Sequence, residues 1–116
     1  MTSIAEFVEN NTATPVVVTD SEGLILDING CFEEVFGWQK SEIIGQHVTI
    51  ILPENFVDSH HLAFSRFQLT EQSTILNHPL KLKAITKDGK EILSEHFIVA
   101  EKIGSTWSFA ACLRPL

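Results

Sequence analysis

His60 is the first residue in this chain whose position suggests ligand chemistry. Residues 56–67 read as a helix, and at about 100° per residue the apolar side chains gather in one arc. His60 lies near the middle of that arc and His61 at its edge. The arc also holds Phe56, Val57, Ala63, Phe64 and Phe67. Burying an unpaired imidazole costs on the order of 1–3 kcal/mol, so His60 either bonds to a backbone carbonyl in the core or binds a ligand.

His78 and His96 fall on predicted strands. Over residues 74–85 the lysines alternate with a leucine-bearing face, which should look toward the helices and which carries His78. Alternatively His78, next to Pro79, is a solvated residue near the end of its strand. On the next strand, His96 shares a face with Ile92, Ser94, Ile98 and Ala100. If that face points inward, His96 enters the same space as His78 and becomes its rival as a ligand.

The elements that must position these histidines follow from periodicity and turn residues. Helical segments are expected at 2–10, 29–36, 41–45, 49–52 and 55–68, and strands at 15–20, 24–28, 73–86, 90–101 and 104–114. Gly89 and Gly104 lie in the expected hairpin turns. The order predicts an α+β fold, in which short helices cover one face of a five-stranded antiparallel sheet and an N-terminal helix is added.

Composition limits the function classes. The 116 residues carry 8 basic and 15 acidic side chains and a net charge of −7, which argues against nucleic-acid binding. No signal peptide or membrane-spanning run is apparent, so we expect a cytoplasmic protein that does not bind membranes. Cys31 and Cys112 have no metal-binding spacing. No hydrolase or nucleotide motif occurs, and we expect no catalytic activity.

The order of several segments resembles the PAS domain family. These segments are TPVVVTDSEGLILDIN, which ends at Asn29, then CFEEVFGW, SEIIGQ and the KDGKEI hairpin. The resemblance covers about residues 12–114 and implies the PAS fold. We therefore expect an N-terminal cap helix over residues 1–11 and a PAS sensor domain over residues 12–116.

Residues 53–67, PENFVDSHHLAFSRF, resemble a narrower group, the haem-binding PAS domains of oxygen-sensing histidine kinases. The matching positions are Pro53-Glu54, His60 and Arg66-Phe67. This resemblance implies haem b with His60 as the proximal ligand, and Arg66 suits a propionate carboxylate. In related phosphodiesterases a methionine that ligates the iron stands at the position of His78, and imidazole could replace it.

The chain also departs from that group. Leu80 stands where the kinases carry an arginine that hydrogen-bonds bound oxygen, and His96 stands at a usually apolar distal position. Ala111 matches a small residue that leaves room for a flat ligand, whereas Phe109 suits core packing with any ligand. The expected cofactor-binding residues are His60, Phe64, Arg66, Phe67, His78, Leu80, His96, Ile98, Phe109 and Ala111, with His60 and His78 as metal ligands.

These patterns predict a sensory domain that binds haem b and signals gas or redox state to a partner or a fused output module. The alternatives are a cofactor-free PAS module for dimerisation or protein interaction, and a PAS domain that binds another small ligand such as flavin. The outer face of the strand at 90–101 carries Leu93, Phe97 and Val99 among glutamates. We expect the N-terminal helix or a second copy of the chain to cover it, and a homodimer to form there.

Overall fold

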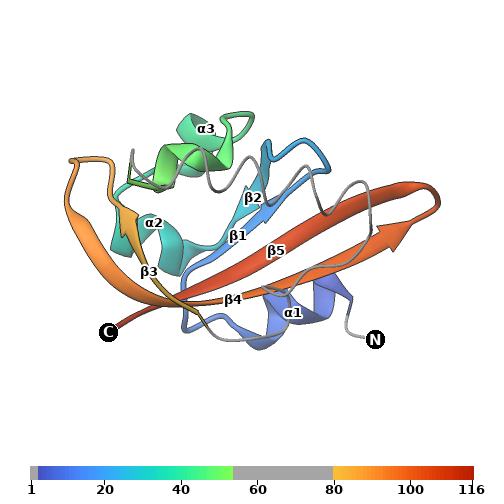
Figure 1. Ribbon diagram of the computed structural model, residues 1–116, viewed down its shortest axis with the longest axis horizontal. Coiled ribbons are helices and arrows are strands. Elements are labelled where there is room, and N and C mark those ends of the chain that lie inside the picture. Colours follow the sequence, from blue (N-terminus) through green and yellow to red (C-terminus); the bar gives the residue numbers. More distant parts are fainter. Residues whose placement is uncertain (1–2, 54–79) are drawn as a thin grey trace.

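The computed structural model describes residues 3–53 and 80–116, which form a five-stranded antiparallel sheet with short helices on it. The sheet order is β2-β1-β5-β4-β3 (Figure 1). Its strands are β1 (Val16–Thr19), β2 (Ile25–Ile28), β3 (Leu80–Ile85), β4 (Glu91–Ile103) and β5 (Thr106–Pro115). The helices are α1 (Ile4–Asn10), α2 (Gly30–Phe36), α3 (Lys40–Ile43) and the 3-10 turn η1 (Val48–Ile51).

The long strands β4 and β5 meet at a tight hairpin. Ile103 pairs with Thr106, so Gly104 and Ser105 form a two-residue turn, and Gly104 has a φ of 65°. Only glycine adopts this left-handed conformation without strain. Both strands end later than expected: β4 continues to Ile103, and β5 continues to Pro115. In the described residues all pairs of β4 beyond His96 are with β5, and this pairing extends β4 beyond what local propensity indicates.

Apolar side chains gather on both faces of the sheet, and helices cover each. On the inner face, Val17, Ala84 and Leu113 contact a cluster that takes Phe32 and Phe36 from α2. Ile43 of α3 and Ile51 of η1 complete this cluster. On the outer face, α1 packs on β1, β4 and β5. Figure 1 accordingly shows α1 on the opposite side of the sheet from α2 and α3.

Asn29 joins three segments of the chain at the start of α2. Its side-chain oxygen accepts hydrogen bonds from the backbone N–H groups of Val16 and Phe32, both at 3.0 Å. Its amide nitrogen donates to the carbonyls of Asn11, at 3.2 Å, and Thr14, at 2.8 Å. One side chain thus caps α2 and holds the loop after α1 against the beginning of β1.

The turn between β3 and β4 is fixed to the helices through Lys87. Its backbone N–H donates to the carbonyl of Phe36 at 2.8 Å. The ammonium pairs with Glu42 and lies 5.6 Å from the ring centroid of Trp38. Glu42 also accepts the backbone N–H of Gln39 and so completes the capping box of α3. This network sets the distance between the helices and the β3–β4 edge of the sheet.

The fold predicted from the sequence is confirmed, with shifts at several element ends. α1 begins at Ile4, after the N-cap Ser3, and α3 begins one residue earlier than expected. β3 is described from Leu80 onward, so the expected strand residues 73–79 and the expected helix 55–68 lie outside the described residues. Within 3–53 and 80–116, no helix is long and apolar enough to cross a bilayer.

Candidate functional site

The described candidate residues share the inner face of the sheet. His96 pairs with Leu113 on one side and with Leu80 on the other, and Ile98 pairs with Ala111. Phe109 follows on the same face of β5, opposite Ala100. The structure therefore brings together His96, Ile98, Phe109 and Ala111, with the backbone of Leu80 beside them. The expected site residues His60, Phe64, Arg66, Phe67 and His78 lie outside the described residues.

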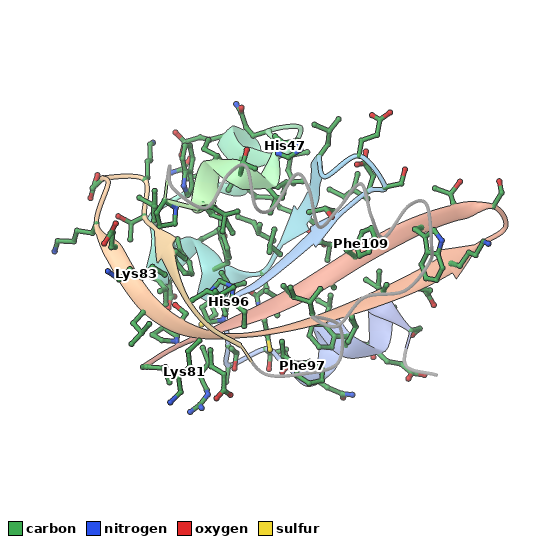
Figure 2. The ribbon with its side chains drawn as sticks, in the orientation of Figure 1. His47, Lys81, Lys83, His96, Phe97 and Phe109 are labelled. Atoms are coloured by element: carbon green, nitrogen blue, oxygen red, sulfur yellow. The ribbon has the colours of Figure 1, made fainter. Side chains whose placement is uncertain are left out.

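The alternation predicted for β3 and β4 is confirmed. On β3, Lys81 and Lys83 are exposed, whereas Ala84 is buried on the side of the helices. The register places Leu82 opposite Ser94 and Leu80 opposite His96, so Ser94 and His96 belong to the inner face. In Figure 2, His96 and Phe109 lie on the side that carries α2 and α3, and Phe97 lies on the side of α1.

His96 is the chemically distinctive group of this face. Its side chain is only 5% exposed, and its buried Nε2 atom has no hydrogen-bond partner among the described residues. Burial lowers the pKa of His96 from 6.5 to about 4, because the surroundings disfavour a charge. The imidazole is therefore neutral at physiological pH, and one of its nitrogens is available to a ligand.

The polar neighbours of His96 do not use this nitrogen. Ser94, fully buried two residues earlier, donates its hydroxyl to the carbonyl of Ile92 at 3.3 Å. The facing positions, Leu113 on β5 and Leu80 on β3, are apolar residues. Within residues 3–53 and 80–116, no carboxylate acts on His96 as one does on a catalytic histidine, and its described surroundings fit ligand binding better than acid–base catalysis.

A second buried nitrogen, the indole Nε1 of Trp38, also lacks a partner in the described part of the chain. Trp38 lies against the inner-face core and beneath the Lys87 ammonium. It belongs to the contact between the β3–β4 turn and the helices. Since an indole N–H only donates a hydrogen bond, it cannot ligate a metal as an imidazole can.

The inner face changes in character along β4 and β5. Around Leu113 and Ala84 it is fully buried under α2, α3 and η1. Farther along, Ile98, Ala100 and Ala111 are only half-buried. Two of these three side chains are alanines, which are small apolar residues. His96 therefore lies at the boundary between a fully buried part of this face and a half-buried part with small side chains.

His47 has a structural role that the sequence analysis missed. Its Nδ1 accepts the backbone N–H of Thr49 at 3.2 Å and lies 3.0 Å from the Thr49 hydroxyl, which caps η1. The ring covers Gly23, where a Cβ atom would approach Nε2 to 2.8 Å. The sequence signal for this role was the place of His47, a polar residue directly before a short helical turn, where N-caps are found. His47 is accordingly part of the scaffold.

The described residues hold no cluster of side chains that could form a metal centre by themselves. No group of three His, Cys, Asp or Glu side chains within 3–53 and 80–116 converges on one point. Burial raises the pKa of the Cys112 thiol, which packs with the α1 cluster on the outer face. Burial also raises the pKa of Cys31 on α2. Both cysteines are therefore poor thiolate ligands.

The outer face carries the surface on which a homodimer was expected. α1 covers it in part: Phe7 stacks on Phe97 with ring centroids 6.4 Å apart, and Val99 is buried in the same cluster. Leu93 is 49% exposed, and its carbonyl accepts the backbone N–H of Leu116, which is itself exposed. The apolar surface left for a partner thus centres on Leu93 and Leu116.

Residues 4–95 match the family model of the PAS fold, and this chain belongs to the PAS family. An uncharacterized protein of Azorhizobium caulinodans is 28% identical over 102 residues, which are 87% of this chain and 14% of that protein. The Sensor protein FixL of Bradyrhizobium diazoefficiens is 34% identical over 61 residues, or 53% of this chain and 12% of FixL. The chain thus spans about one seventh of these relatives or less.

Solved structures confirm the fold. The PAS domain of a protein from Colwellia psychrerythraea has a TM-score of 0.75 at 18% identity, and the match covers 98% of both chains. A light-oxygen-voltage domain studied with a flavin analogue has a TM-score of 0.71 at 17% identity, over 100% of this chain and 87% of that one. At such identities the likeness concerns the fold alone.

Proposed function

We propose that this chain is a haem-binding sensory PAS domain that reports gas or redox state to a partner or output module. The observation that carries the proposal is the buried Nε2 of His96, which has no partner among the described residues and lies on an apolar, alanine-bearing sheet face. The similarity to the Sensor protein FixL and the resemblance of residues 53–67 to haem-binding PAS domains support it. A cytoplasmic location belongs to the same proposal.

In this proposal His60 is the proximal iron ligand, and Arg66 binds a propionate. Phe64 and Phe67 contact the porphyrin from the segment of His60. The sheet residues that the proposal assigns to the site are Leu80, His96, Ile98, Phe109 and Ala111, which are paired neighbours on β3, β4 and β5. Haem would supply an iron that changes its ligands with gas or redox state, while the chain holds it between two apolar surfaces.

The strand β4 offers a route from such a site to a partner. His96 points to the inner face, and the next residue, Phe97, stacks on Phe7 of α1 at the outer face. The backbone N–H of Ile4 also donates to the Glu101 carboxylate at 3.4 Å. A displacement of β4 at His96 would therefore change the packing of α1. Regulation then needs only that ligand binding favours one of two α1 arrangements.

The similarity to a light-oxygen-voltage domain favours a second candidate, a flavin-binding PAS domain. Its isoalloxazine ring is also flat and would fit the same half-buried alanines. A cofactor-free interaction module is the third candidate, for which the exposed Leu93 and Leu116 provide a contact surface. A homodimer through this surface and α1, burying on the order of 1,000 Å², is compatible with all three.

Absorption spectroscopy of the purified protein titrated with haemin tests the proposal directly. Wild type should bind one haem per chain and show an intense Soret band. His60→Ala should abolish stoichiometric binding, whereas His61→Ala, the matched control, should retain it. Equal haem affinity in wild type and His60→Ala would refute the proximal assignment. Flavin fluorescence without a Soret band would favour the second candidate.

A further inference from the structure

We propose that Nε2 of His96 is the second axial ligand of the iron, so that a side chain of the sheet itself closes the sixth coordination position. This inference rests on the proposed haem function and chooses among the histidines of the chain. The sequence named His60 and His78 as metal ligands and left His96 as a rival to His78 for the second position. The choice depends on contacts that the structure describes around His96.

The first argument is the orphaned nitrogen. His96 is more than nine-tenths buried, and among the described residues no donor or acceptor meets its Nε2. Buried polar atoms in native proteins almost always have a partner, and an exception calls for a bound group. Ser94, the polar residue nearest along the same face, already bonds to a backbone carbonyl. The partner that Nε2 lacks is therefore sought in a ligand.

The second argument is the chemistry of the paired positions. On β5, His96 pairs with Leu113, and on β3 it pairs with Leu80. A leucine side chain has no donor or acceptor, so neither paired residue can supply the hydrogen bond that Nε2 lacks.

The third argument is rigidity. β4 is hydrogen-bonded on both sides, to β3 and to β5, and His96 lies at a paired position in each ladder. Its backbone therefore has little freedom, as is required of an axial ligand with a defined geometry. The neighbouring inward residues Ile98 and Ala111 are apolar and only half-buried.

The experiment compares the ferric absorption and electron paramagnetic resonance spectra of haem-loaded wild type, His96→Leu and His78→Leu. Wild type and His78→Leu should be six-coordinate and low-spin. His96→Leu should bind haem at the same stoichiometry but become high-spin, and added imidazole should restore the low-spin spectrum. Ferrous His96→Leu should bind carbon monoxide with an affinity about tenfold higher or more, because no protein side chain competes for the position.

Two further variants keep the test decisive. His96→Met retains a ligating side chain and serves if circular dichroism shows that His96→Leu does not fold; it should give a spectrum distinct from that of wild type. Ile98→His in the His96→Leu background moves the imidazole along the same face and should not restore the wild-type spectrum. High-spin wild type, low-spin His96→Leu, or loss of the low-spin state in His78→Leu would overturn the inference alone. Failure of wild type to bind haem would instead refute the proposed function.

Discussion

Removing the side chain of Asn29 should destabilise the domain more than the removal of a typical polar side chain does. Asn29 makes four hydrogen bonds, two as acceptor and two as donor, to segments on either side of α2 and β1. Each such bond contributes about 1 kcal/mol net, and partners left unpaired add to the loss. Asn29→Ala should therefore lower the free energy of unfolding by about 4 kcal/mol.

Asn29→Asp separates the two halves of this network. The aspartate keeps an oxygen for the N–H groups of Val16 and Phe32 but loses both donors. Its second oxygen then faces the carbonyls of Asn11 and Thr14, to which the amide donates in wild type. We expect a loss of about 2 kcal/mol, smaller than that of the alanine variant because the cap of α2 is kept.

Equilibrium urea unfolding, followed by the fluorescence of Trp38 and Trp107, measures both effects. The control is Asn10→Ala, an exposed asparagine at the end of α1, which should change stability by less than about 0.5 kcal/mol. A loss below about 1 kcal/mol for Asn29→Ala, or equal losses for the alanine and aspartate variants, would refute the assigned roles.

Further predictions concern the two faces of the sheet. The hydrogen bond from the Lys87 ammonium and the hydrogen bond from the Gln39 N–H both lower the pKa of Glu42. The charged carboxylate therefore contributes its full stability at neutral pH. This contribution is lost as the pH falls through the folded-state pKa of Glu42. Urea midpoints should show the stability gap between wild type and Glu42→Gln closing in acid. Phe97→Ala removes the stacking on Phe7 and should cost about 2 kcal/mol, with faster hydrogen exchange in α1; unchanged α1 exchange would contradict the packing role. Leu93→Glu should weaken the proposed homodimer in light scattering, and an unaltered dimer would exclude this surface.

The sheet could be predicted from the sequence because its signals are local. Strict alternation separates Lys81 and Lys83 from Leu82 and Ala84, and glycines mark both hairpin turns. These signals depend on side-chain direction and backbone conformation, which a short segment fixes by itself. The exact strand ends could not be predicted, because the reach of β4 to Ile103 depends on its pairing with β5.

The partners of Asn29 could not be read from the sequence either. The asparagine was recognised as a feature of the family, but its bonds to Asn11 and Thr14 cross 18 and 15 residues of chain. Such contacts exist only after β1 and α2 have packed together. The same limit applies to the candidate site. Alternation put His96 on a face with Ile98, but only the register with β3 and β5 shows that this face is the inner one. Only the packed structure shows that Nε2 meets no partner among the described residues.

Strand β4 connects the candidate site on the inner face of the sheet with α1 on the outer face. Adjacent residues of one strand point to opposite sides: His96 into the candidate site and Phe97 onto α1. A single peptide bond joins these two residues. A ligand that displaces the imidazole of His96 therefore also shifts the backbone to which the Phe97 side chain is attached. A helix held by a few apolar contacts responds to such a change more readily than the doubly paired strand itself. If His96 binds the proposed haem, replacing it with leucine should therefore reduce the effect of haem on hydrogen exchange in α1 while haem stays bound. An undiminished effect would show that the signal leaves the site by a route other than β4.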